Sequence, residues 1–173
     1  MARTHEEWMA FVDGENFMYR GARSLKNAGI EILEGELYSP NRFLWMPGAA
    51  DARSLIRSAV QSCVPHGLVK TDAMRVHYYT SIHGDHDAVE STSDSLWELG
   101  LSPIVLKSKN RIEKNTAHPI KSKGVDITMT TDLLTHAYQN SYSLAVIVTG
   151  DEDYIPAINQ VRSTGKDVML MAF

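Results

Sequence analysis

Segments of strand character alternate along this chain with segments of helical periodicity, and this alternation constrains the fold more than any other sequence feature. Strand-like segments lie at residues 8–12, 73–81, 101–106, 143–149 and 167–173, and helix-like segments at 15–28, 49–63, 86–99, 125–138 and 151–163. Residues 29–48 show neither pattern and are expected to be irregular. Strands that alternate with helices form a mostly parallel sheet with helices on its faces. We therefore expect an α/β fold built on a mostly parallel five-stranded sheet.

Length and composition favour one globular domain. The chain has 173 residues, of which 43% are hydrophobic and 22% charged, so it can bury a substantial core. It contains no internal repeat and no linker rich in proline, glycine or serine. We expect a single domain over residues 8–173, while its homo-oligomeric state is left open.

Neither a membrane partner nor export is expected. The longest apolar runs, at residues 144–148 and 168–173, are far shorter than the roughly 18 residues that a membrane span needs. Glu6 and Glu7 stand where a secretory signal would require apolar residues. The single cysteine, Cys63, cannot form an intramolecular disulfide. These features predict a cytoplasmic location.

Positive charge is concentrated in one segment. The formal net charge is −4, but residues 107–123 carry six bases and one acid, so this segment has a charge of +5 and the remainder −9. Such a segment could hold phosphates electrostatically. It could equally be a solvated loop that only keeps the protein soluble.

Aspartates follow two of the predicted strands. Asp13 ends the first strand, Asp151 and Asp153 follow the fourth, and Asp126 opens the preceding helix. Ligand sites of parallel sheets form beyond the carboxyl ends of the strands, so these acids are expected to meet if the two strands are neighbours. Clustered carboxylates repel one another unless a cation neutralises them, and oxygen ligands favour Mg²⁺ or Mn²⁺. Each aspartate taken alone could also be a turn former or a helix cap.

Three ordered motifs resemble a known family. Residues 13–17 (DGENF), 123–126 (KGVD) and 149–154 (TGDEDY) are similar to the motifs of the NYN (LabA-like) branch of PIN-like nucleases. The resemblance implies a three-layer α/β/α sandwich and a metal-dependent endoribonuclease that acts on single-stranded or structured RNA and leaves a 5′-phosphate. It also implies that four acids bind Mg²⁺ or Mn²⁺ and serve in catalysis: Asp13, Asp126, Asp151 and Asp153.

Further residues match the motifs less directly. Asn16 could orient a carboxylate or hold a phosphate oxygen, Thr149 could hydrogen-bond Asp13 or Asp151, and Lys123 could neutralise the scissile phosphate. Asp132 lies six positions after Asp126, about 240° around a helix, so it is a second-tier candidate with a capping or supporting role. Tyr154 stands where phenylalanine is frequent and would keep an aromatic plug.

Alternatives stay open from the sequence alone. The domain could be a catalytically quiet RNA-binding or scaffold module on the same fold. It could also be a phosphatase of the haloacid-dehalogenase kind with Asp13 as nucleophile, although such enzymes have a second aspartate where this chain has Glu15. Family domains often continue past the final strand, so a trimmed C-terminus is also left open.

Two other groups of residues could have a function but are not part of the predicted site. Residues 83–87 contain two histidines and two aspartates but are expected to form a loop and a helix start. Tyr78, Tyr79, Phe43 and Trp45 could stack on bases, but packing in the core is expected for them.

Overall fold

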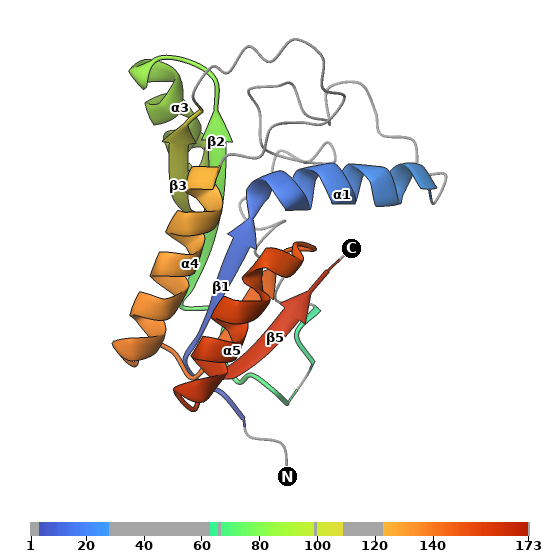
Figure 1. The fold of residues 1–173 in the computed structure, drawn as a ribbon, viewed down its shortest axis with the longest axis vertical. Helices are drawn as coiled ribbons and strands as arrows, with labels where there is room; N and C mark the ends of the chain where they lie inside the picture. The colour runs from blue at the N-terminus through green and yellow to red at the C-terminus, as the bar shows by residue number, and fades with distance from the viewer. Residues whose placement is uncertain (1–3, 28–62, 66, 99, 109–122, 173) are drawn as a thin grey trace.

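The computed structural model describes residues 4–27, 63–65, 67–98, 100–108 and 123–172 (Figure 1). The elements in chain order are β1 (Trp8–Asp13), α1 (Gly14–Asn27), β2 (Arg75–Ile82), α3 (His86–Glu98), β3 (Ser102–Lys107), α4 (Lys123–Tyr138), β4 (Leu144–Val148), the 3₁₀ helix η1 (Glu152–Tyr154), α5 (Ile155–Ser163) and β5 (Asp167–Met171). The predicted helix at 49–63 falls almost entirely outside the described residues, as do residues 29–48 and most of the basic segment. None of the described helices is long and apolar enough to cross a membrane.

All five strands are parallel and form one sheet in the order β3-β2-β1-β4-β5. This confirms the predicted α/β fold. The chain winds from β1 through β2 to β3 in one direction, and β4 and β5 are added on the other side of β1. The direction of winding therefore reverses between β1 and β4, and the crevice at their carboxyl ends is the usual ligand position of such sheets.

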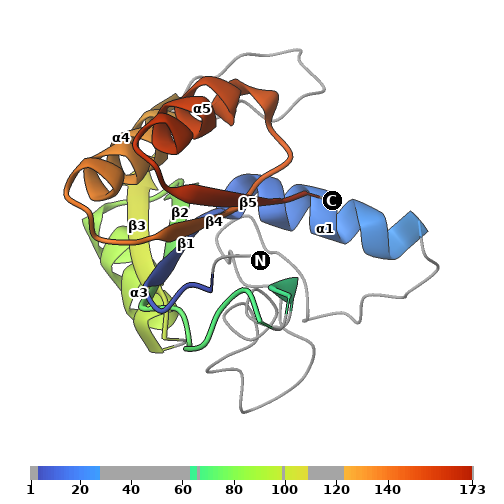
Figure 2. The same ribbon diagram turned by 90° about the horizontal axis from the view of Figure 1, so that it is seen from below.

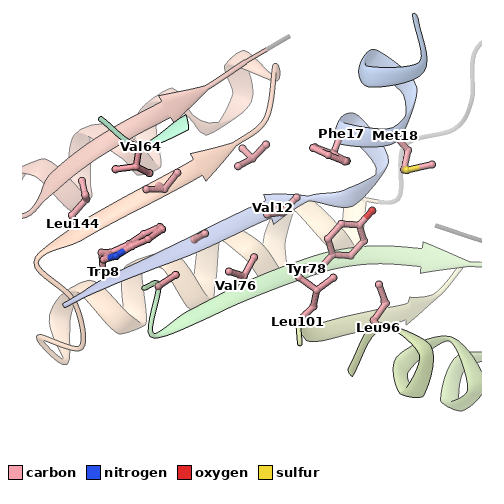
Figure 3. Packing of buried hydrophobic residues seen from close by; sticks show 14 of the residues in the cluster. Trp8, Val12, Phe17, Met18, Val64, Val76, Tyr78, Leu96, Leu101 and Leu144 are labelled. Atoms are coloured by element: carbon pink, nitrogen blue, oxygen red, sulfur yellow. The ribbon is translucent and has the colours of Figure 1, made fainter. Parts of the chain in front are cut away.

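Alternating side chains of β1 fill two separate cores, one on each face of the sheet. Trp8, Ala10 and Val12 belong to the core beneath α1 and α3, and Met9 and Phe11 belong to the core beneath α4 and α5. All five are at most 4% exposed, as expected of a central parallel strand that is covered on both faces. Figure 3 shows the first core, and Figure 2 shows α4 and α5 covering the opposite face of the sheet. The structure is thus the predicted three-layer sandwich.

The helix predicted at residues 151–163 is wrong at its start. The chain first forms η1, and α5 begins only at Ile155. Pro156 lies in the first turn of α5 and has no N–H, so it cannot continue a helical hydrogen-bond ladder from the preceding residues. The side chain of Asp151 caps η1 by accepting a hydrogen bond from the backbone N–H of Asp153.

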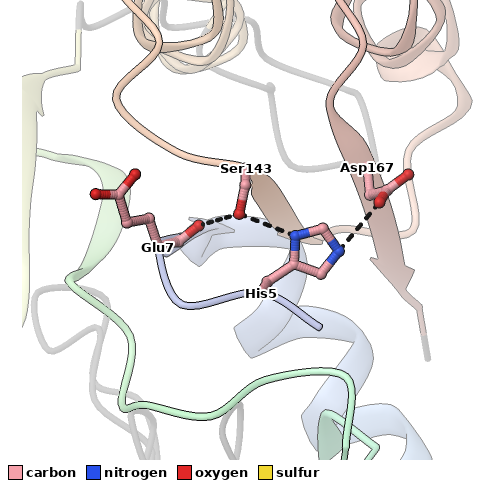
Figure 4. Close-up of polar contacts among 4 residues, drawn as sticks. All are labelled: His5, Glu7, Ser143 and Asp167. Atoms are coloured by element: carbon pink, nitrogen blue, oxygen red, sulfur yellow. Dashed lines mark hydrogen bonds and ion pairs between the residues drawn. The ribbon is translucent and has the colours of Figure 1, made fainter. Parts of the chain in front are cut away.

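The N-terminal segment is fastened to the sheet at the end opposite the crevice (Figure 4). The Nδ1 of His5 lies 2.9 Å from the Oγ of Ser143, and its Nε2 lies 3.0 Å from a carboxylate oxygen of Asp167. These are the residue types of a hydrolase triad. However, Ser143 donates its hydroxyl to the carbonyl of Glu7, and His5 is only 1% exposed, so no substrate can reach the imidazole. The group joins the starts of three strands and has a structural role.

Candidate metal centre at the sheet edge

Asp13 is the last residue of β1 and lies at the point where the winding direction reverses. It is 3% exposed, and the next residue, Gly14, already begins α1. A Cβ on Gly14 would lie 2.5 Å from Cε1 of Tyr78 and 2.8 Å from the carbonyl oxygen of Tyr79. Glycine therefore lets the chain turn directly from strand to helix against β2. This local geometry keeps Asp13 buried at the carboxyl end of β1.

Two hydrogen bonds hold the buried carboxylate of Asp13. Its Oδ1 accepts from the backbone N–H of Asn16 at 3.0 Å, and its Oδ2 accepts from the hydroxyl of Thr149 at 3.0 Å. Burial raises the pKa of Asp13, these two hydrogen bonds partly offset that rise, and the nearby charges of Asp126 and Glu15 raise it further. The net pKa is above the usual aspartate value, so a positive charge in the crevice would stabilise the ionised carboxylate.

A chain of hydrogen bonds joins the first and third sequence motifs. The side-chain oxygen of Asn16 accepts from the backbone N–H of Gly150 at 2.8 Å, and the hydroxyl of Thr149 accepts from the N–H of Asp151 at 3.2 Å. The carboxylate of Asp151 in turn accepts from the N–H of Asp153 at 3.1 Å. The turn after β4 is thereby fixed against the start of α1. The hydrogen bond from Thr149 to Asp13 that the sequence suggested is present.

Asp126 reaches the same edge from α4. Its Oδ1 accepts a hydrogen bond from the hydroxyl of Tyr154 at 3.0 Å, and Tyr154 is 1% exposed. Burial is the main cause that raises the pKa of the Tyr154 hydroxyl, and the charges of Asp13, Asp126 and Glu15 raise it further. The hydroxyl therefore stays protonated and serves as a fixed donor. Asp13 belongs to the first motif and Asp126 to the second, and the charges of both raise the pKa of Tyr154. The two carboxylates therefore lie close to each other.

Sequence reasoning missed two contributors to this edge. Tyr154 was expected only as an aromatic plug, but its hydroxyl donates a hydrogen bond to Asp126. Glu15 is half-buried, accepts a hydrogen bond from the hydroxyl of Ser81, and adds negative charge beside Asp13. In the sequence, only the position of Glu15 inside the first motif indicated that it could lie at this site.

The remaining predicted site residues are placed differently. Asp153 is exposed at the rim, in η1. Asp132 accepts a hydrogen bond from Tyr79 at 3.1 Å, about 9 Å further along α4 than Asp126 at 1.5 Å per residue, so it lies away from the other acids. Lys123 is the first residue of α4, and its side chain lies outside the described part of the chain.

The acids converge on one edge but do not form a closed cage. Among the residues that the structure describes, no three aspartate, glutamate, histidine or cysteine side chains are grouped closely enough to hold an ion by themselves. Mg²⁺ generally keeps several waters and is bound through one or two carboxylates together with substrate phosphates. Such a cation needs fewer protein ligands than a closed cage supplies.

The other residues that drew attention are structural where they are described. Tyr78 and Tyr79 are fully buried, so core packing is confirmed and base stacking is not available to them. Asp85 accepts a hydrogen bond from the backbone N–H of Ala88 at 3.0 Å and so caps α3. Phe43 and Trp45 lie outside the described residues.

Comparisons with known proteins agree with this architecture. Residues 8–173 match the NYN domain family, which is a PIN-like nuclease domain. The crystal structure of a protein of unknown function from Vibrio parahaemolyticus is similar, with a TM-score of 0.52, 14% sequence identity, and coverage of 99% of this chain and 84% of that one. At this identity the similarity supports the fold alone. A search of curated protein sequences gives no significant match.

Proposed function

The chain belongs to the NYN domain family, and from this premise we propose that it is a metal-dependent endoribonuclease that hydrolyses phosphodiester bonds of single-stranded or structured RNA. The observation that carries the proposal is the buried carboxylate of Asp13, which lies where the neighbouring strands β1 and β4 end, with its pKa raised by burial and by neighbouring acids. A protein gains nothing in stability from such a charge. It is the kind of feature that marks a functional site.

The donor set supports Mg²⁺ or Mn²⁺ as the cofactor. Asp13, Asp126 and Asp151 would hold the ion, with Asp153 at the rim, because these side chains offer only oxygen atoms, which hard divalent cations prefer. When bound, the ion would neutralise charge on the scissile phosphate and acidify the attacking water, leaving a 5′-phosphate on the product.

Residues of the chain would keep the site ready for that cation. Thr149 and the backbone N–H of Asn16 stabilise the ionised form of Asp13, since both donate hydrogen bonds to its carboxylate. Tyr154 fixes the orientation of Asp126 in the same way. Because Oδ1 of Asn16 is occupied by Gly150, its amide NH₂ group is the part that would contact a phosphate oxygen.

Lys123 and the basic segment would add positive charge along the RNA, as an acidic chain needs local cations to hold a polyanion. We also propose a cytoplasmic location, based on the single cysteine, Cys63, which is exposed and unpaired.

Cleavage of end-labelled single-stranded RNA tests the proposal. The wild type should cut the RNA in Mn²⁺ or Mg²⁺ and lose activity in EDTA. Asp13→Asn should reduce the rate by about 10²-fold or more, since electrostatic groups at the reacting centre usually contribute on that scale. Asp94→Asn changes an exposed acid on α3 and serves as the matched control.

The outcomes also separate the alternatives. RNA binding without metal-dependent cleavage would favour the quiet RNA-binding module. Trapping of Asp13 by an aspartyl-phosphate mimic would favour the phosphatase. The hydrogen bond between Glu15 and Ser81 does not support the phosphatase. It engages the carboxylate of Glu15, which stands where such a phosphatase has its second aspartate.

A further inference from the structure

Arg20 lies over the turn that carries the third motif. It is on α1, four residues after Asn16, and residues at this spacing share one face of a helix. A Cβ on Gly150 would lie 2.9 Å from both Cδ and Nε of Arg20 and 3.0 Å from Cζ. The arginine side chain therefore packs directly on the backbone of Gly150, between Thr149 and Asp151. The lack of a side chain at residue 150 makes room for it.

The position of Arg20 suits recognition of an anion at the rim of the crevice. Arg20 is exposed, whereas Asp13, which accepts a hydrogen bond from Thr149 of the same turn, is buried. A guanidinium stays charged at any physiological pH, and its planar fork matches two oxygens of a phosphate. Packing on Gly150 limits the conformations of the side chain, so less entropy is lost when an anion binds.

The negative charge of the nearby acids would repel RNA, and a positively charged side chain such as that of Arg20 would offset this repulsion. Asp13, Asp126, Asp151 and Glu15 all contribute negative charge there, and the whole chain has a net charge of −4. A bound metal ion would neutralise the scissile phosphate, but the flanking phosphates of an RNA strand would still be repelled by the acidic body.

We propose that Arg20 binds an RNA phosphate that flanks the scissile one, and so sets the position of the strand across the turn at 149–151. This inference rests on the proposed function, because it takes RNA as the ligand of the same crevice. It makes Arg20 a substrate-binding residue. Arg20 lies outside the three sequence motifs and reaches the site through the contact of α1 with the turn after β4.

RNA affinity measured by fluorescence anisotropy tests the inference. EDTA is present so that the labelled RNA stays intact. Arg20→Ala should weaken binding about tenfold, the usual scale of one charge-assisted contact, and should lower the slope of log Kd against log[salt] by about 0.7. Arg20→Lys should keep the salt slope but recover only part of the affinity. Arg162→Ala, in the last turn of α5 just before the start of β5, should change neither the affinity nor the salt slope.

Gly150→Ala provides an independent check on the geometry. The added Cβ should displace the end of Arg20 and weaken RNA binding in the wild type. In the Arg20→Ala background the same substitution should have no effect, because nothing remains to be displaced. Equal effects in the two backgrounds would overturn the contact as the cause.

The failure of this inference can be told apart from the failure of the proposed function. If the wild type binds and cleaves RNA but Arg20→Ala retains both affinity and salt slope, the role of Arg20 is refuted and the nuclease proposal stands. If Arg20→Ala weakens binding but Mn²⁺ produces no cleavage in the wild type, the role of Arg20 stands and the nuclease proposal fails. If the wild type neither binds RNA in EDTA nor cleaves it in Mn²⁺, both are refuted.

Discussion

Replacement of Thr149 by valine should expose how strongly the fold supports its buried acid. Thr149 is 1% exposed, and its hydroxyl makes two hydrogen bonds, to the carboxylate of Asp13 and from the N–H of Asp151. Valine has nearly the same shape, so Thr149→Val removes these bonds with little change in packing. A hydrogen bond to a charged group contributes about 1.5–3 kcal/mol, and we expect the free energy of unfolding to fall by about 2 kcal/mol at pH 7.

A matched control is available on strand β2, which lies on the other side of β1 from β4. Thr80 is also fully buried, but its hydroxyl has no hydrogen-bond partner among the residues that the structure describes. Thr80→Val should therefore be neutral or slightly stabilising, because it removes a buried polar atom without breaking a bond. Urea unfolding measures both variants, and the fluorescence of the buried Trp8 reports the transition.

The dependence on charge gives the prediction a second test. The bond from Thr149 stabilises only the ionised form of Asp13, so its contribution is present above the pKa of Asp13 and lost as the pH falls through it. Thr149→Val should therefore cost less at low pH, and less in an Asp13→Asn background. The reasoning is refuted if Thr149→Val costs under 0.5 kcal/mol, a threshold at the lower limit for one hydrogen bond, or if Thr80→Val costs as much.

Three further predictions follow from individual contacts. Tyr154→Phe keeps the packing but removes the donor to Asp126, so Mn²⁺-dependent cleavage should fall about 10- to 100-fold while the domain stays folded; an unchanged rate would contradict the orienting role. Gly14→Ala should lower the free energy of unfolding by about 1–3 kcal/mol in urea titrations, because the backbone of Tyr79 cannot easily move aside; wild-type stability would refute the close contact. His77 is buried, and mainly this burial lowers its pKa from 6.5 to about 4. The free energy of unfolding should therefore be highest above pH 6.5 and fall by up to about 3 kcal/mol as the pH drops toward 4, because the unfolded chain binds the proton more readily. His77→Phe should flatten that pH profile in unfolding experiments at pH 7 and 4.5, and an equally steep loss in the variant would assign the acid sensitivity elsewhere.

The layout of the sheet was predictable because each strand carries its own signal. The run from Trp8 to Val12 is apolar at every position, as a strand covered on both faces requires, and it ends in a sharp polar boundary at Asp13. The same pattern marks β4. Since the winding of α/β sheets follows general rules, the ends of these strands could be expected to meet.

The contacts that orient the acids could not be predicted in the same way. Tyr154 and Asp126 are separated by 28 positions, and no local pattern says that a hydroxyl on η1 will meet a carboxylate on α4. The seat of Arg20 on Gly150 likewise depends on the angle between α1 and β4, which packing determines. The start of α5 was misjudged because the apolar spacing of Ile155, Ile158 and Val161 does not define where the first turn begins. Pro156, in that first turn, cannot continue a helical hydrogen-bond ladder from η1.

Binding of Mn²⁺ to the purified protein, measured by titration calorimetry, tests the central claim most directly. The wild type should bind the ion, and Asp13→Asn and Asp126→Asn should each weaken that binding at least about tenfold, since each removes a charged ligand. Asp132→Asn, on the same helix as Asp126 but hydrogen-bonded to Tyr79, should leave it unchanged. Absence of binding in the wild type, or equal affinity in all three variants, would contradict a metal centre at this edge of the sheet.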